Sequence, residues 1–315
     1  MHLWDQLNHI VLLDEQMRVT DKSYQEMLNR LREGKCTDND IKMLNTRVKR
    51  PDVDITSFKD NLIIVPGNVL VMSINDLFAH HHSQSKKVFL STAKDSFKRK
   101  KMPTNLANLI KNYPSTKTRG LPRELPLFVG MPIFLTDNIA VELGLTNGTT
   151  GVVRSIHLKN GEVISGDTGF YHLEHTPDYI IVELDDITMK PLDGLKPNHV
   201  PIDSKTNSIP VKLKGKQKPI SFSRTHFPLV PRFSCTAHKS QGKTLTRAIV
   251  DLIPQKGRVG GIEINFSYVP LSSVRTLNDL TILRPFDPSI LNARVNKDCA
   301  AMMEEFKARD VCRDM

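Results

Sequence analysis

The feature that most constrains the fold is a change of pattern along the chain. Residues 61–92 alternate between an apolar strand-like segment (NLIIVPGN), a helix-like segment (VLVMSINDLFAHH) and a second strand-like segment (KVFLST). Such alternation is typical of a parallel sheet with helices on its faces. From about residue 126, short strand-like segments separated by Gly, Pro and Asn follow instead, as in a small barrel or sandwich. After Pro231 the first pattern returns, so we predict an α/β domain interrupted by a β-rich insertion.

Local patterns predict further elements on both sides of the insertion. Residues 20–34 should form a helix that Thr20 or Asp21 caps and Gly34 ends. Its apolar residues fall on one helical face: Tyr24, Met27, Leu28 and Leu31. The other predictions are a buried strand in 9–18, a short helix from Thr37 with Ile41 and Leu44 inward, a long connection with at most one short helix over 93–125, strands at AIVDL and LTILRP, and a helix from about Pro288 to the end.

The charge of the chain favours a polyanionic partner. The formal net charge is +10, a balance that is most often met in proteins that bind nucleic acid. The charge is clustered, with seven basic residues and one acid over 86–101 and six basic residues and one acid over 201–225. Clustered charge favours a surface that binds a row of phosphates, and the alternative is a basic protein that is merely soluble. Clustering does not distinguish DNA from RNA.

Several classes of protein are disfavoured by composition. No apolar run reaches the length of a membrane span, and the start of the chain lacks the basic region of a secretory signal. The four cysteines form no CxxC pair, which indicates reduced thiols in an intracellular protein rather than zinc ligands or disulfides. His80, His81 and His82 are consecutive, but no accompanying ligand pattern supports a metal, so we predict no metal site.

One segment imitates a nucleotide-binding loop without being one. Gly242, Lys243 and Thr244 match the end of the Walker A pattern G-x4-GK[ST], which requires a glycine at position 237, where this chain has Ala237. GK[ST] occurs nowhere else in the sequence. We therefore expect no phosphate-cradling loop within these residues.

Four segments, taken in order, resemble the carboxy-terminal half of Pif-type superfamily 1 DNA helicases, including those encoded by Helitron transposons. They are LDEQMRVTD (13–21), LPLFVGMPIFLTDNIAVELGLTNGTTGVV (125–153), CTAHKSQGKTLTRAIVDL (235–252) and SYVPLSSVRTLNDLTIL (267–283). The resemblance implies an α/β fold, namely the second RecA-like domain of a P-loop helicase over 1–144 and 231–315. An SH3-like β-barrel would be inserted at 145–230.

The resemblance also implies roles around the nucleotide. Arg18 would point into the cleft between two RecA-like domains, near the phosphates, where a guanidinium can stabilise the charge of phosphoryl transfer. Gln241 and Gly242 would lie between the DNA path and that cleft. ATP and Mg²⁺ would be held only if a first RecA-like domain completes the site, and a separate polypeptide could carry that domain. The chain begins where the second domain of the family begins.

Other residues would contact single-stranded DNA or a DNA fork. His238, Lys239 and Ser240 match the segment whose helix start faces the strand, where backbone N–H groups favour an anion. A structural role for His238 is the alternative. Asn68 and Asn75 match a family position where a strand-to-helix turn contacts DNA. The alternative is that Asn68 favours the turn and that Asn75 is a polar residue of the helix.

Lysines alternate along the insertion at Lys212, Lys214, Lys216 and Lys218. On a strand they share one face, which would form either a phosphate track or an edge strand that its lysines protect from aggregation.

The last segment departs from the family pattern YVALSR. It reads Tyr-Val-Pro-Leu-Ser-Ser, so Ser273 stands where the family has its phosphate-sensing arginine. Arg275 follows two residues later, and on a helix it would be turned by about 200°, so it should not substitute.

Three hypotheses stay open: a piece of a 5′-to-3′ helicase, a stand-alone nucleic-acid-binding module, and a transposon-derived relic. Relatives act in the nucleus or the mitochondrion, which the resemblance carries over as an expectation.

Overall fold

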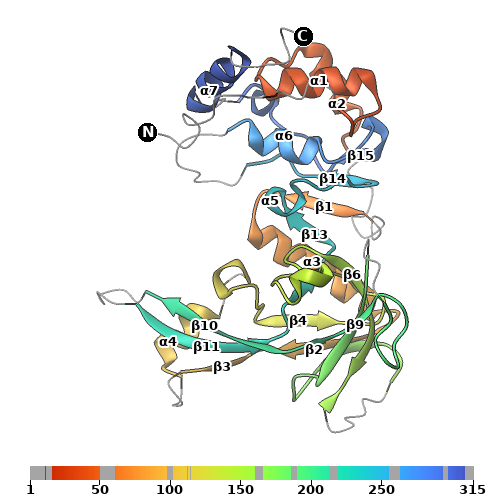
Figure 1. Ribbon diagram of the computed structural model, residues 1–315, viewed down its shortest axis with the longest axis vertical. Helices are drawn as coiled ribbons and strands as arrows, with labels where there is room; N and C mark the ends of the chain where they lie inside the picture. Colours follow the sequence, from red (N-terminus) through yellow and green to blue (C-terminus); the bar gives the residue numbers. More distant parts are fainter. Residues whose placement is uncertain are drawn as a thin grey trace. The chain divides into compact units, whose positions relative to one another are not determined.

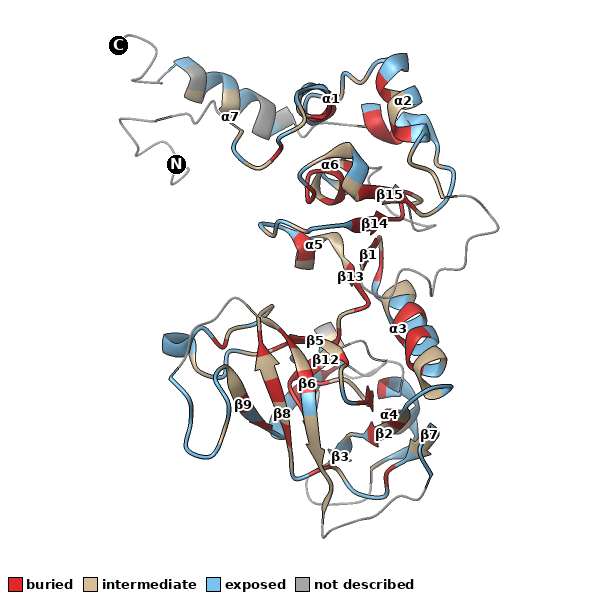
Figure 2. Ribbon diagram, turned by 90° about the vertical axis from the view of Figure 1, so that its right-hand side faces the viewer, coloured by how far each residue is buried: buried red, intermediate tan, exposed pale blue. Residues whose placement is uncertain are grey.

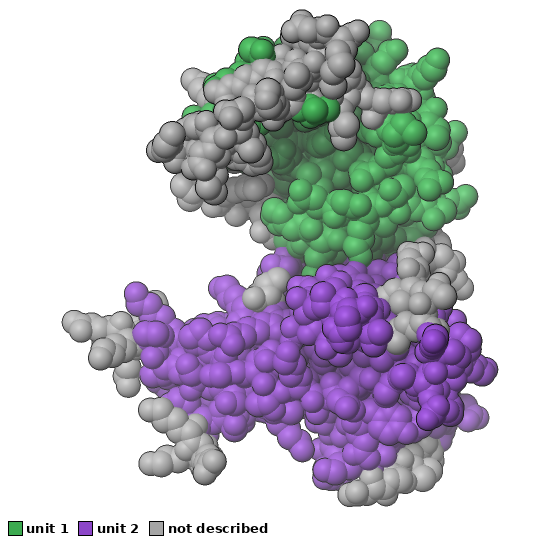
Figure 3. Space-filling view, in the orientation of Figure 1, with its two compact units in different colours: residues 1–67, 235–315 green, residues 68–234 purple. Residues whose placement is uncertain are grey.

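The computed structural model describes residues 11, 16–49, 61–97, 102–111, 113, 115–159, 166–185, 190–212, 219–254, 263–293 and 297–308. The chain divides into two compact units, which Figure 3 distinguishes by colour. Unit 1 comprises residues 1–67 and 235–315, and unit 2 comprises residues 68–234. Each unit is described by itself.

Unit 1 is built on a parallel sheet with the strand order β13-β1-β14-β15. Its strands are β1 (Leu62–Val65), β13 (Ser234–Thr236), β14 (Ala248–Val250) and β15 (Leu280–Ile282). β1 runs parallel to β14, and β14 runs parallel to β15. All residues of β1 and β14 are buried (Figure 2), as expected for strands covered on both faces. The predicted strands at 61–68, AIVDL and LTILRP are thereby confirmed.

The α-helices described in unit 1 are α1 (Lys22–Arg32), α2 (Asp38–Asn45), α5 (Ala237–Ser240), α6 (Asn265–Leu271) and α7 (Lys297–Ala308). The predicted helix over 20–34 is confirmed as α1, with its apolar face buried and Asp21 as its cap. Helix α6 lies between α1 and the sheet (Figures 1 and 2). The predicted strand at 9–18 lies largely outside the described residues.

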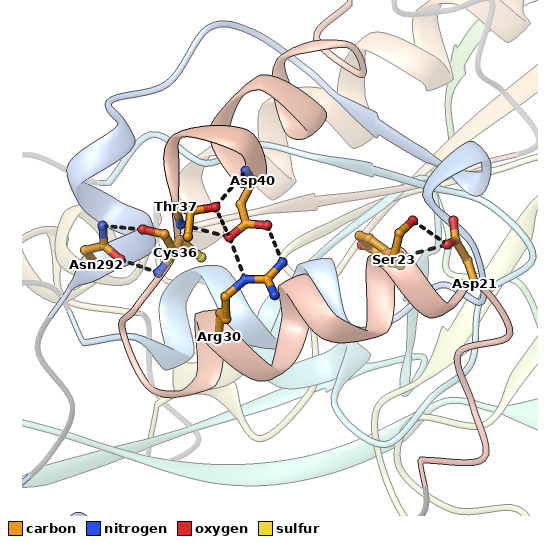
Figure 4. A network of polar contacts seen from close by, with 8 residues as sticks. Asp21, Ser23, Arg30, Cys36, Thr37, Asp40 and Asn292 are labelled. Carbon is orange, nitrogen blue, oxygen red and sulfur yellow. Dashed lines mark hydrogen bonds and ion pairs between the residues drawn. The ribbon is translucent and has the colours of Figure 1, made fainter.

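Helices α1 and α2 are fastened together by an ion pair (Figure 4). The Arg30 guanidinium donates two hydrogen bonds to the Asp40 carboxylate, at 2.9 and 2.7 Å. The same carboxylate accepts from the backbone N–H and hydroxyl of Thr37, which begins α2 in a capping box. These donors, Arg30 foremost, lower the pKa of Asp40 to about 2. The Asp40 carboxylate is therefore charged at neutral pH, and its hydrogen bonds hold the turn between the two helices.

Unit 2 is mostly β-structure. Its strands are β2 (Lys87–Thr92), β3 (Lys94–Ser96), β4 (Glu124–Leu127), β5 (Pro132–Leu135), β6 (Thr150–His157), β7 (Gly169–His172), β8 (Tyr179–Leu184), β9 (His199–Asp203), β10 (Lys205–Val211), β11 (Ile220–His226) and β12 (Leu229–Pro231). They form sheets of order β12-β5-β6-β8-β9, β10-β11-β3 and β4-β2-β7. Its helices are α3 (Asn68–Ser83) and α4 (Thr104–Ile110). The β-rich texture predicted from residue 126 onward is confirmed.

The two units do not coincide with the predicted domains, because the segment before the expected insertion pairs with strands inside it. Strand β2 runs parallel to β7, and β3 is antiparallel to β11. Residues 68–144 therefore cluster with 145–230. The prediction of a long connection with at most one short helix over 93–125 is wrong, since β3, helix α4 and a 3-10 helix (Ser115–Thr118) lie within it. That the units are RecA-like and SH3-like stays a prediction.

Helix α3 is joined to the end of unit 2 through Asn75. This side chain is buried, and its carbonyl oxygen accepts from the backbone N–H of Ser234 at 3.0 Å and from the Ser234 hydroxyl at 3.1 Å. The amide nitrogen donates to the Pro231 carbonyl at 3.4 Å. Asn75 therefore serves as an internal clamp, the structural alternative that the sequence left open for it.

His226 is the centre of a second buried polar cluster in unit 2. Nδ1 lies 3.0 Å from the Pro122 carbonyl, and Nε2 lies 3.1 Å from the Ser91 hydroxyl. Because a carbonyl can only accept, Nδ1 carries the proton and Nε2 accepts from Ser91. Burial lowers the pKa of His226 to about 4. The ring is therefore neutral in the folded protein at neutral pH.

Unit 2 should lose stability as pH falls from about 6.5 toward 4. The unfolded chain takes up a proton on His226 in that window and the folded chain does not, so the contribution is present above pH 6.5. Replacing His226→Gln should flatten this part of the pH profile. Urea unfolding at several pH values measures it, with the exposed His238→Gln as the matched control. Equal slopes for the wild type and H226Q would contradict the assignment.

Candidate functional site

The segment with Arg18 is bound to the carboxyl end of α6 in unit 1. Arg18 Nη1 donates to the Ser272 carbonyl at 3.0 Å, and the Tyr24 hydroxyl donates to the Leu271 carbonyl at 2.7 Å. The backbone N–H of Thr20 donates to the Arg275 carbonyl at 3.1 Å. The last carbonyls of a helix have no partner within it, and here donors from a distant segment supply one.

The segment after α5 is hydrogen-bonded to the same residues that follow α6. The backbone N–H of Leu245 donates to the Ser273 carbonyl at 2.8 Å, and Leu245 forms a parallel β-bridge with Val274. Three of the four segments that carry the resemblance therefore meet at residues 271–275. The fourth, 125–153, belongs to unit 2. We call the meeting place, formed by Arg18, Leu245 and residues 271–275, the candidate site.

Arg18 is the residue for which the sequence predicts a contact with a phosphate. Its side chain is only partly buried, and a single donor, Nη1, is engaged with Ser272. A guanidinium has five N–H donors in a fixed fork, so one bond to the backbone orients it and leaves others to face an anion. This arrangement fits an arginine that contacts a nucleotide's phosphates. Its role stays a prediction.

Ser273 and Arg275 do not occupy equivalent places. Ser273 is 1% exposed, and its hydroxyl donates to the Pro270 carbonyl at 2.6 Å, back into the helix end. Arg275 is exposed. Because α6 ends at Leu271, the helical-wheel reasoning from the sequence does not apply to either residue. Burial nevertheless supports the expectation that Arg275 does not substitute for an arginine at 273, because position 275 is at the surface and position 273 is in the interior.

Helix α5 is a single turn, which changes one expectation. Four residues align few peptide dipoles, so the attraction of its start for an anion is weaker than a long helix would give. His238 is exposed. Lys239 is partly buried, and desolvation lowers the pKa of its amine. The hydroxyl of buried Ser240 donates to the Ala237 carbonyl at 2.9 Å and is thereby engaged within the turn.

Gln241 and Gly242 form the exposed turn that follows α5. Gly242 has φ +78°, in the left-handed region that glycine adopts without strain. A Cβ built on it would meet no atom within 4 Å. The glycine is therefore required by the backbone conformation of the turn, while the space beside it is open to a ligand.

The remaining predicted contacts lie in unit 2. Asn68 is exposed at the first residue of α3. Lys212 is exposed and follows the last residue of β10, while Lys214, Lys216 and Lys218 lie outside the described residues. The choice between a phosphate track and a lysine-protected edge strand therefore stays open for residues 213–218.

Sequence reasoning missed Tyr24 as a polar anchor of the candidate site. It counted Tyr24 only as part of the apolar face of α1. The ring is indeed buried, yet the hydroxyl closes the end of α6, and burial raises the pKa of this phenol far above its usual value. A tyrosine on a face otherwise made of Met and Leu is the signal that could have found it, because buried hydroxyls need partners.

The described part of the structure also contains neither a metal-binding cluster nor a membrane-spanning helix. There, no three His, Cys, Asp or Glu side chains gather so as to hold a metal ion. None of the helices so described is long and apolar enough to cross a membrane.

Comparison with known proteins relates this geometry to one family. No family model matches the chain. The ATP-dependent DNA helicase PIF1 of Xenopus laevis is 25% identical over 298 residues, which cover 92% of this chain and 38% of that protein. The chain resembles Pif1-type superfamily 1 helicases.

Solved Pif1 structures share the fold of this chain. The Bacteroides Pif1 bound to single-stranded DNA superposes with a TM-score of 0.62 at 20% identity, over 94% of this chain and 56% of that one. Pif1 from Candida albicans gives 0.61 at 19% identity, over 94% and 60%. A structure of DNA unwinding at forked DNA by two Pif1 helicases gives 0.63 at 20% identity, over 95% and 55%. The chain thus spans between about two fifths and three fifths of these Pif1 relatives.

Replacing Tyr24→Phe should destabilise unit 1 without changing its packing. The Leu271 carbonyl would be left buried and unpaired, which costs about 1–3 kcal/mol. Denaturant unfolding measures the loss, with Tyr268→Phe as the control because Tyr268 is a half-buried tyrosine on α6 itself. Losses of the same size in the two variants would argue against a special role for the Tyr24 hydroxyl.

Proposed function

We propose that the chain is the second RecA-like lobe of a Pif1-type 5′-to-3′ DNA helicase, with an SH3-like barrel inserted in it. In this proposal unit 1 carries Arg18 to the phosphates of ATP, and both units contribute to a path for single-stranded DNA. The lobe with the Walker A loop and the Mg²⁺-binding acid would come from elsewhere, because G-x4-GK[ST] occurs nowhere in the 315 residues.

The observation that carries the proposal is the convergence at residues 271–275. Segments separated by more than 200 residues are held there by hydrogen bonds from Arg18, Thr20, Tyr24 and Leu245. Phosphoryl transfer depends almost entirely on positioning and on charge stabilisation. An arginine held at a fixed place suits that task, and the likeness to Pif1 structures supplies the nucleotide and DNA as expected ligands.

A second candidate function is a nucleic-acid-binding module that has no motor activity. It is favoured by Ser273, which stands buried where the family has a phosphate-sensing arginine. The two candidates agree on DNA binding and differ in ATP hydrolysis. In both, the net charge of +10 predicts affinity that falls as salt rises.

Two measurements on the whole chain test the proposal. Fluorescence anisotropy with a labelled DNA single strand should show binding at low salt that weakens steadily as salt increases. ATPase assays of the chain alone, with and without this strand, should stay at background. Robust DNA-stimulated hydrolysis by the chain alone would contradict the incomplete site, and absence of binding at low salt would contradict the DNA path.

Adding a polypeptide that carries the first RecA-like lobe of a Pif1 relative separates the two candidate functions. A helicase lobe should then support DNA-stimulated hydrolysis, and Arg18→Ala should lower kcat by about 10³-fold, the lower range for such arginines. Arg32→Ala, on the exposed side of α1, is the matched control and should leave kcat unchanged. Background hydrolysis with an added lobe that demonstrably binds would favour the module without motor activity.

A further inference from the structure

The three-stranded sheet β10-β11-β3 of unit 2 has two chemically different faces. On one face, α4 covers an apolar cluster in which Leu106 and Ile110 pack against Ile209, Val211 and Phe222. Side chains on a strand alternate between the two faces, so the intervening residues point the other way. This second face is solvent-exposed or half-exposed throughout.

The strand register arranges the second face in rows. Thr206 pairs with Thr225, which pairs with Lys94, and Ser208 pairs with Ser223, which pairs with Ser96. Pro210 pairs with Ser221 in the third row. We call these residues the hydroxyl face: Lys94, Ser96, Thr206, Ser208, Pro210, Ser221, Ser223 and Thr225. Six of its eight side chains are hydroxyls, and the hydroxyls of Thr206 and Thr225 lie 2.7 Å apart.

The hydroxyl face carries no carboxylate, because the acid of these strands points to the opposite face. Asp95 lies between Lys94 and Ser96, and it accepts two hydrogen bonds from Arg224 at 2.7 and 2.8 Å. Arg224 is 0% exposed. This buried pair fixes the register of β3 against β11. It also keeps the negative charge of Asp95 away from the face where an anion would approach.

The same register sets the direction of the outer strands. β3 and β10 are both antiparallel to β11, so they run in the same direction. β10 ends opposite Ile220, the first residue of β11, and β3 ends opposite Ser223. Lys94 on β3 and Lys212, which follows β10, are both exposed, so the described cations of this hairpin and its neighbour favour an anion as the ligand.

We propose that the hydroxyl face is a docking surface for the sugar–phosphate backbone of a single DNA strand. The proposal rests on the proposed function and names a surface for it. Hydroxyl and lysine side chains are common donors to phosphate oxygens, and such contacts position a strand without reading its sequence. The face lacks the large apolar or aromatic side chains that form the core of a protein interface or stack on bases. Binding here should therefore tolerate any base sequence and respond strongly to salt.

The central pair of the face provides a test in which charge alone changes sign. Ser208→Glu with Ser223→Glu places two carboxylates opposite each other, and Ser208→Lys with Ser223→Lys places two amines there. Both double variants put like charges side by side, so they disturb the sheet similarly. The glutamate pair should weaken binding of a labelled DNA strand by roughly tenfold or more near 0.1 M salt, since one lost phosphate contact is worth about that much. The lysine pair should strengthen it.

The control has the same charge change elsewhere in unit 2. Ser85→Glu with Thr168→Glu alters two exposed residues that lie on neither face of this sheet, and binding should stay within about twofold of the wild type. Lys94→Ala should lower the slope of log K against log salt by about 1. Circular dichroism and thermal unfolding of every variant confirm that each is folded.

The outcomes separate this proposal from the function on which it rests. If the glutamate pair and the lysine pair change the DNA affinity equally, or leave it unchanged, the hydroxyl face is not the docking surface. The proposed DNA path would still stand in that case. No salt-dependent binding of the wild type to DNA would overturn both. Displacement of DNA by polyglutamate at equal charge, with tighter binding of polyglutamate than of DNA, would assign the face to an acidic protein and overturn the proposal.

Discussion

The candidate site depends on how the carboxyl end of helix α6 is closed. Its last carbonyls need donors, and Pro270 shortly before the end has no N–H to continue the ladder. The donors are Tyr24 and Arg18, 247 and 254 residues away from their acceptors. Closing the helix therefore also places the arginine. The same contacts that complete the secondary structure of unit 1 fix the geometry that the proposed chemistry requires.

The sheet of unit 1 also tolerates the long stretch of chain between its strands. Strand β1 ends at Val65 and its neighbour β14 begins at Ala248, yet the two pair residue for residue. A parallel pair always needs a crossover, and nothing in the ladder limits its length. Unit 2 has three sheets of its own and buried polar clusters around Asn75, His226 and Arg224. Two self-contained sets of interactions therefore coexist in one chain.

Local features could be predicted from the sequence because their causes are local. Helix α1 follows from the spacing of its apolar residues and from Asp21, whose carboxylate accepts from the backbone of Tyr24. Strands β1, β14 and β15 follow from short apolar runs. The pairing of β2 with β7 and of β3 with β11 could not be predicted, because it joins residues that the sequence separates by some 80 to 130 positions. The predicted domain boundaries differ from the compact units for that reason.

The candidate site shows the same division. Arg18 could be named as a candidate from its segment, whereas Tyr24 could not be recognised as a second donor that closes the same helix end. Ser273 illustrates the opposite limit, since the sequence shows the missing arginine but only the structure shows that the position is buried. A guanidinium at a site 1% exposed would need the end of α6 to be built differently. The buried serine and the closed helix end are thus two aspects of one local arrangement, and in the proposed function the positive charge near the phosphates would come from Arg18.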